Sequence, residues 1–246
     1  MRVKAAILTH IGGRPRNEDA ALCQKLFVGD GQEIPEIVDF EIAPPWFVAV
    51  ADGMGGYGNG EFASRHILEF LALASPKSSG EWLQQTVLAH RNLLQMAETR
   101  ALGPCGTTLA ALSIGPDEML AVNIGDSRIY RSDGNYLMLL STDDSQFQRM
   151  ADSGGTGNES GNMLRQAIGG PTGRAEPQAN IRSLASVTCR FMLCTDGVTD
   201  TLTLDEIESS VCCVDLSTAA ASLQDKLTSS KCQDNFTFII LDLQNS

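Results

Sequence analysis

The sequence predicts an α+β fold in which a mainly antiparallel β-sheet arrangement is covered by helices. Short apolar or alternating runs, each bounded by glycine, proline or aspartate, predict seven strands. Apolar residues at helical spacing occur in other segments. Strands and helices follow one another in blocks rather than in strict alternation, which argues against a doubly wound parallel sheet.

The predicted strands share this pattern of an apolar run that ends at a turn-forming residue. In chain order they are 3–8 (VKAAIL), 46–52 (WFVAVAD), 105–114 (CGTTLAALSI), 119–124 (MLAVNI), 128–132 (RIYRS), 191–196 (FMLCTD) and 236–243 (FTFIILDL). Gly53 and Gly197 directly follow two of them, where a chain reversal is expected.

Helices are predicted in three segments. The first, 61–75, carries Phe62, Ile67, Phe70 and Leu71 on one side, and the second, 81–100, carries Leu83, Val87, Leu94 and Met96 in rough helical register. A shorter helix is predicted over 217–227, with the Ser217 hydroxyl as its N-cap.

Two stretches are predicted to be loops. Residues 29–45 are acidic and contain prolines, and we expect a hairpin excursion there. Residues 153–161 (SGGTGNESG) are glycine-rich and polar, and we expect them to be the most mobile part of the chain. No change in composition marks a boundary, so residues 1–246 are predicted to form a single domain.

Composition limits the classes of function. The net charge of −12 argues against a nucleic-acid partner, because phosphate backbones are bound by clustered Lys and Arg. Seven cysteines without a C-x-x-C pair indicate buried free thiols rather than disulfides or a zinc site. The first ten residues are too short and polar for a signal peptide, and no apolar run approaches about 18 residues. We therefore expect a cytoplasmic protein without a membrane segment.

Acidic residues recur at the ends of predicted strands, three of the four beside glycine. They are Asp52, Asp126, Asp196 and Asp234. A single Asp-Gly is a common turn, but several carboxylates brought together repel one another unless cations neutralise them. Oxygen-only ligands suit Mg²⁺ or Mn²⁺ rather than zinc. No EF-hand segment is present, and the glycine runs lack the Walker lysine and the dinucleotide spacing.

Six short motifs together resemble the metal-dependent protein phosphatases of type 2C, in their compact bacterial form. They are Gly13–Asp19 (R-x-x-N-E-D), Ala51–Gly56 (D-G-x-G-G), Gly106–Thr108 (G-T-T), Ile124–Arg128 (G-D-S-R), Thr195–Asp200 (D-G-[LV]-x-D) and Asp234–Asn235 (D-N). Each is weak alone, and the family order and spacing of all six make the signal strong. The resemblance implies two packed antiparallel sheets flanked by helices on both outer faces.

The resemblance also implies a site for two divalent cations, Mn²⁺ or Mg²⁺. Asp52 would bridge both ions, and the Gly53 carbonyl would bind one of them. Asp196 and Asp234 would complete the shell of the first ion, and Glu18 that of the second. Two cations clamp the attacking and leaving oxygens and lower the pKa of the water between them.

Two further residues acquire roles from the resemblance. Asp19 would hydrogen-bond metal-bound water, and Arg14 would hold the substrate phosphate. The family spacing selects Arg14 over Arg16, although alternation along an extended segment cannot separate them. No Cys-x₅-Arg motif of the thiol phosphatases is present.

A third cation, bound in several bacterial relatives, would take Asp126 and Asp143 as ligands. The alternative for Asp126 is a structural role, tying Arg128 or a backbone turn. The sequence also departs from its relatives: Met54 stands where many eukaryotic members have His, and Asp144 where the bacterial pattern has His. The family's flap corresponds to 145–169. These departures bear on substrate choice more than on the basic chemistry.

The expected function is hydrolysis of phosphoserine and phosphothreonine in proteins, opposing a Ser/Thr kinase. We expect a free-standing monomer. One alternative is a pseudophosphatase that binds a partner without turnover, although no metal carboxylate of the motifs is lost. Another is a two-metal enzyme that acts on small phosphoesters.

Overall fold

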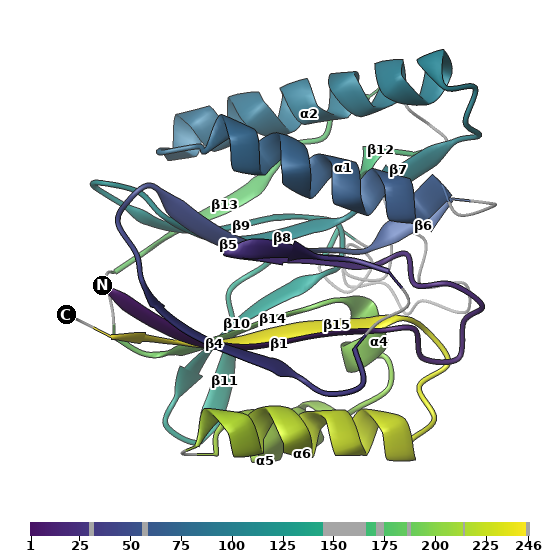
Figure 1. Cartoon of the computed structure of the whole chain (residues 1–246). Helices are drawn as coiled ribbons and strands as arrows, with labels where there is room; N and C mark the ends of the chain where they lie inside the picture. The colour runs from purple at the N-terminus through teal and green to yellow at the C-terminus, as the bar shows by residue number, and fades with distance from the viewer. Residues whose placement is uncertain are drawn as a thin grey trace, which may run out of the picture.

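The computed structural model describes residues 1–29, 32–55, 59–144, 166–170, 175–185, 188–213 and 215–244. Two antiparallel sheets pack face to face, and helices cover the outer face of each, giving four layers in the order α/β/β/α (Figure 1). The predicted α+β class and the two-sheet sandwich are confirmed.

The first sheet contains the strands from both ends of the chain. Its order is β11 (Tyr136–Leu139), β10 (Arg128–Asp133), β14 (Arg190–Cys194), β15 (Phe236–Gln244), β1 (Arg2–His10) and β4 (Glu36–Glu41). β1 and β15 pair antiparallel from Arg2 opposite Gln244 to His10 opposite Phe236. The segments that follow His10 and precede Phe236 therefore meet at one end of the sheet.

The second sheet has the order β13 (Asn180–Leu184), β9 (Met119–Ile124), β8 (Leu109–Ile114), β5 (Trp46–Ala51), β2 (Ala20–Cys23) and β3 (Lys25–Phe27). A small sheet of β12 (Ile168–Gly169), β7 (Cys105–Thr107) and β6 (Gly53–Gly55) adjoins it. Asp52 separates β5 from β6, and Thr108 separates β7 from β8. Both residues thus lie where the chain passes between the sheets.

Two pairs of helices form the outer layers. α1 (Asn59–Ala74) and α2 (Ser79–Thr99) cover the second sheet. α5 (Leu204–Val211) and α6 (Leu216–Ser229) cover the first sheet, and the short α4 (Asp196–Thr199) follows β14. Each longer C-terminal helix has its own cap: the Thr203 hydroxyl accepts from Glu206 N–H, and Asp215 accepts from Thr218 N–H.

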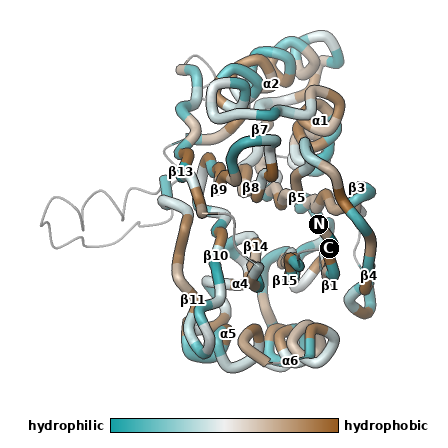
Figure 2. The backbone as a smooth tube through the Cα atoms, turned by 90° about the vertical axis from the view of Figure 1, so that its left-hand side faces the viewer, coloured by the Kyte–Doolittle hydropathy of each residue, from teal (hydrophilic) through white to brown (hydrophobic). Residues whose placement is uncertain are grey.

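Alternate residues of the central strands face different layers. In β1, Val3 and Ile7 lie between the two sheets, whereas Ala6 and Leu8 pack under α5 and α6. Such strands are buried on both faces, so their sequences are mostly apolar, as the tube coloured by hydropathy shows for β5, β8 and β9 (Figure 2).

Several expected boundaries need correction. The run 105–114 is two strands, because the chain leaves the small sheet at Thr108 to enter β8. Asp196 does not end a strand but begins α4. The last helix is capped by Asp215 rather than Ser217 and starts at Leu216. The predicted loop 29–45 contains β4, an edge strand paired with β1.

Part of the predicted flap, residues 145–165, lies outside the described residues, and so does the expected loop 153–161. The flap's last two residues form β12. All seven cysteines are free: Cys23, Cys105, Cys194 and Cys232 are buried, whereas Cys189, Cys212 and Cys213 are partly buried. Within the described ranges, no helix combines the length and the apolarity needed to cross a membrane.

Candidate metal centre

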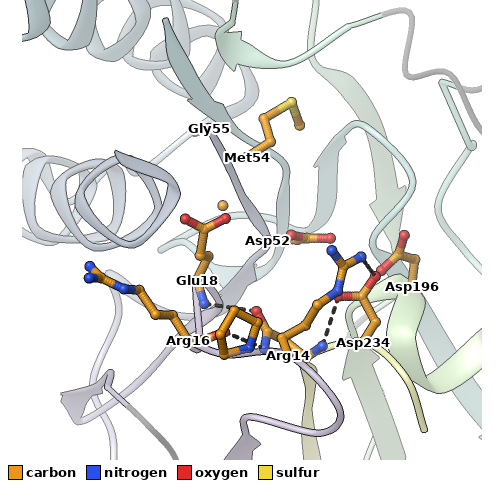
Figure 3. Close-up of a pocket in the computed structure, with 11 residues that line it drawn as sticks. Arg14, Arg16, Glu18, Asp52, Met54, Gly55, Asp196 and Asp234 are labelled. Carbon is orange, nitrogen blue, oxygen red and sulfur yellow. Dashed lines mark hydrogen bonds and ion pairs between the residues drawn. The ribbon is translucent and has the colours of Figure 1, made fainter. Parts of the chain in front are cut away.

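A cavity of about 650 Å³ lies at the end of the sandwich where the two sheets meet. Residues from four separate stretches of sequence line it: Arg14, Pro15, Arg16, Glu18, Asp52, Gly53, Met54, Gly55, Asp196, Asp234 and Asn235. Glu18, Asp52, Asp196 and Asp234 all face this space (Figure 3). The structure therefore brings together the five residues expected to hold the two ions.

Asp52 is fixed through its backbone. Its N–H donates to Thr108 Oγ1 over 2.9 Å, and its carbonyl accepts from Thr107 Oγ1 and Thr108 N–H over 2.8 and 2.9 Å. Thr108 Oγ1 is in turn 2.7 Å from Ser127 Oγ. The G-T-T and G-D-S-R motifs thus hold the proposed bridging residue in place.

Glu18 lies in a tightly packed corner. Its N–H donates to Asn235 Oδ1 over 2.8 Å, and its carbonyl accepts from Ser64 Oγ over 2.6 Å. A Cβ on Gly60 would lie 2.7 Å from Glu18 Cδ, and a Cβ on Gly53 would lie 2.4 Å from the Glu18 carbonyl oxygen. Only glycine permits this approach of α1 and β6 to Glu18.

Asp196 begins α4 just after β14, and Asp234 lies just before β15, the strand paired with β14. A Cβ on Gly197 would lie 1.9 Å from the Asn235 carbonyl oxygen, so glycine after Asp196 lets the two segments touch. The Asn235 amide donates to the carbonyls of Ile11 and Arg16, each over 2.8 Å. Asn235 thereby joins the segment before β15 to the segment that carries Glu18.

Asp19 is buried beneath the cavity rather than facing it. Its Oδ2 accepts from Thr195 Oγ1 over 2.8 Å, and it is 1 % exposed. Burial, with a smaller contribution from the charges of Asp196 and Asp234, raises the pKa of Asp19 to about 7. The neighbouring Asn17 amide donates to Thr9 Oγ1, which also accepts from Thr237 Oγ1. A buried polar network therefore supports the floor of the site.

The carboxylates repel one another. Burial raises the pKa of Asp52 well above its usual value, and the charges of Asp19, Asp196 and Asp126 raise it further. The pKa of Asp196 is raised by burial and then by Asp200 and Asp234. A cluster of acids that resists ionisation is the environment in which divalent cations recover the lost stability.

In the described part of the chain, no three His, Cys, Asp or Glu side chains are grouped as closely as a bound ion requires. Arg14 forms an ion pair with Asp234, so one of these acids already has a positively charged partner within the protein. A hard cation also draws ligands from backbone carbonyls and water, as Mg²⁺ commonly does. The donor set, four carboxylates and the Gly53 carbonyl, consists of oxygen atoms only and fits Mg²⁺ or Mn²⁺.

The two arginines point in different directions. Arg14 Nη2 lies 2.6 Å from Asp234 Oδ2, so its guanidinium is inside the acidic cluster. Arg16 extends away from that cluster (Figure 3). Of the two arginines, Arg14 is therefore the one paired with an acid of this cluster.

The expected third-ion residues occupy a separate place. Neither Asp126 nor Asp143 lines the cavity. Asp143 forms a bidentate ion pair with Arg128, at 2.6 Å from Nη2 and 2.9 Å from Nε to the same oxygen. Asp126 Oδ1 is buried without a hydrogen-bond partner, alone among buried side-chain oxygen and nitrogen atoms of the described residues. Arg128 is thus tied by Asp143 rather than by Asp126.

Sequence reasoning did not assign the residues that hold the ligands in place. Asn235, Thr108, Asn17 and Thr195 all belong to the quoted motifs or adjoin them, but their hydrogen bonds join positions remote in sequence. Thr108 and Thr195 are polar residues inside apolar runs, whereas Asn17 and Asn235 lie in polar segments and belong to the motifs. Met54 lines the cavity, and none of the lining residues is a histidine.

Comparison with known proteins identifies relatives. The family model described as protein phosphatase 2C matches residues 41–231. The chain is 28 % identical over 208 residues to the serine/threonine protein phosphatase PstP of Mycobacterium tuberculosis, covering 80 % of this chain and 40 % of PstP. It is 29 % identical over 177 residues to the serine/threonine phosphatase stp of Listeria welshimeri, covering 65 % of this chain and 69 % of that protein. The chain thus spans about two fifths of the length of PstP.

Solved structures of bacterial phosphatases have the same fold as this chain. The M. tuberculosis phosphatase PstP/Ppp superposes with a TM-score of 0.78 at 25 % identity and 100 % coverage of both chains. A PstP catalytic domain solved in complex with two manganese ions gives a TM-score of 0.77 at 24 % identity, covering 99 % of this chain and 100 % of that one. The fold, the six motifs and the family match converge, and the chain belongs to the protein phosphatase 2C family.

Proposed function

We propose that this protein hydrolyses phosphoserine and phosphothreonine in proteins at a centre of two divalent cations. The observation that carries the proposal is the convergence of Glu18, Asp52, Asp196 and Asp234 on one cavity that also contains the Arg14 guanidinium. The names of the relatives, serine/threonine phosphatases, support the substrate class.

The ions would be Mn²⁺ or Mg²⁺. Asp52, with Asp196 and Asp234, would hold one ion, and Asp52 with Glu18 the other, and the Gly53 carbonyl would bind one of the two. Two manganese ions in the related PstP structure support this number. When bound, such ions neutralise phosphate charge and activate water for attack on phosphorus.

The chain's own residues would position the substrate. Arg14 offers a planar, two-pronged donor for phosphate oxygens. It can exchange its carboxylate partner Asp234 for the substrate phosphate once a cation neutralises that acid. Asp19, held by Thr195, would orient a water at the floor of the cavity. Met54 cannot donate a proton, so the leaving group would take its proton from water or depart before it is protonated.

A third cation beside Asp126 and Asp143 remains part of the proposal. The orphaned Asp126 Oδ1 supports it, because a buried carboxylate oxygen without a donor is costly unless a partner is added. Asp143 already forms an ion pair with Arg128, so Asp126 would be the principal ligand of this third cation.

We further propose that residues 1–246 act as one catalytic domain, as a monomer in the cytoplasm, on proteins that a Ser/Thr kinase phosphorylates. The pairing of β1 with β15 supports a single domain, since the first and last strands share one sheet. Seven free cysteines support a reducing compartment. The net charge of −12 argues against a nucleic-acid partner.

The test is hydrolysis of a phosphothreonine peptide beside a small phosphomonoester, with Mn²⁺, with Mg²⁺ and with excess EDTA. We expect turnover of the peptide with either metal and loss of turnover with EDTA. Full activity in metal-free buffer contradicts the metal mechanism. Activity on the phosphomonoester alone identifies a small-molecule phosphatase, and metal binding without turnover identifies a pseudophosphatase.

A further inference from the structure

We propose that Asp144 is a positioning residue that fixes the direction of Asp126 by holding the peptide groups of Gly125. The proposal deepens the proposed function and rests on it, because it concerns the ion that Asp126 would bind. Asp144 follows the β10–β11 hairpin, and Asp126 follows β9. Sequence alone gives no reason to connect the two.

Asp144 holds Gly125 from both sides. The Gly125 N–H donates to Asp144 Oδ2 over 3.1 Å, and the Asp144 N–H donates back to the Gly125 carbonyl over 2.9 Å. Both peptide groups that flank the Gly125 Cα are therefore bound by one residue. Because Asp126 is the next residue, its backbone direction follows from this pair of bonds.

Gly125 lies at a turn with little freedom. Its φ is +96°, and a Cβ there would lie 2.7 Å from Thr108 Cγ2. Thr108 is the residue whose hydroxyl accepts from Asp52 N–H. The turn that delivers Asp126 is thus packed against the residue that holds the proposed bridging ligand, and its displacement bears on the metal site.

The contacts of Asp144 require a carboxylate. Besides Gly125 N–H, its oxygens accept from Gln166 Nε2 and from Asn180 Nδ2, all at 3.1–3.2 Å. The side-chain amide of Gln166 cannot flip to exchange its oxygen and nitrogen, because its Oε1 accepts from Gln178 N–H over 2.8 Å. Both oxygens of residue 144 therefore face donors.

This arrangement predicts that one substitution breaks the hydrogen bonds of residue 144 and that a second substitution restores them. In Asp144→Asn, one carboxylate oxygen becomes an NH₂ group that faces the NH₂ of Gln166. Both groups are donors, so the hydrogen bond between residues 144 and 166 is lost. In the double variant Asp144→Asn/Gln166→Glu, the new amide donates to the new carboxylate, which still accepts from Gln178. The repair restores the hydrogen bonds with the same total charge as the parent.

The experiment is calorimetric titration with Mn²⁺ in the absence of substrate, together with thermal unfolding. The variants are Asp126→Ala, Asp144→Asn, Gln166→Glu and the double variant, with the exposed Asp225→Asn as a charge control. We expect Asp126→Ala to lose one ion. Asp144→Asn should weaken that same ion by about 10–100-fold, the effect of removing a residue that orients a ligand. The double variant should recover to within about threefold of the parent.

Several results overturn the inference. They are parent-like Mn²⁺ binding by Asp144→Asn, equal weakening of all ions, no recovery in the double variant, or no lost ion in Asp126→Ala. If Asp144→Asn does not fold, Gln166→Glu alone sets two carboxylates against each other and must weaken the same ion. Absence of Mn²⁺ binding by the parent defeats the proposed function itself. A parent that binds Mn²⁺ beside a parent-like Asp144→Asn defeats only this inference.

Discussion

Asp52 combines a rigid backbone with an electrostatically unfavourable side chain. Thr107 and Thr108 hold its peptide groups, while burial and three neighbouring carboxylates oppose its ionisation. A side chain placed so firmly in an unfavourable position is typical of a ligand site, where the cation supplies the missing stabilisation.

Asp52→Asn keeps the volume and removes the shared charge. We expect kcat to fall by at least about 10²-fold, as when a key electrostatic stabiliser is lost. The metal-free protein should become more stable, because one of the repelling acids is gone. Steady-state kinetics and thermal unfolding in EDTA check both effects, with Asp225→Asn as the control. Near-normal activity at low Mn²⁺ would mean that Asp52 does not bridge the ions.

The arginines at positions 14 and 16 give a second test at this scale. Arg14→Ala should raise KM for a phosphopeptide with a smaller effect on kcat, because a ground-state phosphate contact is lost. Arg16→Ala, whose side chain points away from the acids, should change either constant little. Arg14→Lys should rescue poorly, since an ammonium cannot make the two-pronged contact. A larger KM defect at Arg16 than at Arg14 would overturn the assignment.

At the scale of elements, the position of α1 depends on one glycine. Gly60 lies in α1 against Glu18 and Gly53, with space for a hydrogen atom only. The site is therefore formed by the packing of a helix against a strand end as much as by the acidic side chains.

Gly60→Ala tests this packing. In an open helix position, alanine is favoured over glycine by about 1 kcal/mol. At Gly60 the new Cβ would lie 2.7 Å from Glu18 Cδ and from the Gly53 carbonyl carbon, so we expect lower thermal stability and weaker Mn²⁺ binding. Gly80, in α2 with nothing within 4 Å of its Cβ position, is the matched control and should gain stability as alanine. Equal behaviour of the two variants in unfolding and in Mn²⁺ titration contradicts the packing argument.

The elements also show what sequence reasoning can reach. Strands β1, β5, β9 and β15 were predicted because they are largely buried on both sides and hence rich in apolar residues. The edge strands β3, β4, β11 and β13 were missed, because their mixed exposure resembles that of loops. Residues in motifs were found by type and order, but partnerships such as Asn235 with Glu18 depend on contacts between distant segments.

At the scale of the whole molecule, metal ions and protons should compete for the buried carboxylates, and each should stabilise the fold when bound. Burial raises the pKa of Asp19 and that of Asp126 each to about 7, against about 4 for an exposed Asp. Such a group favours the fold when protonated. Its contribution is fully present below the unfolded pKa and is lost as the pH rises through the folded pKa.

The metal-free protein should therefore lose thermal stability as the pH rises from about 4 to about 7, between the pKa of an exposed Asp and the raised pKa of Asp19 and Asp126. Saturating Mn²⁺ should reverse the trend, because the ions bind the ionised carboxylates and protons compete with them as the pH falls. With Mn²⁺ at about 100 times its Kd, the added stability is about 2.7 kcal/mol, which corresponds to a rise in Tm of about 5–10 °C for a chain of this size. Thermal unfolding across this pH range, in EDTA and in Mn²⁺, measures both slopes. Parallel slopes in the two conditions would show that the buried acids and the ions do not share a site.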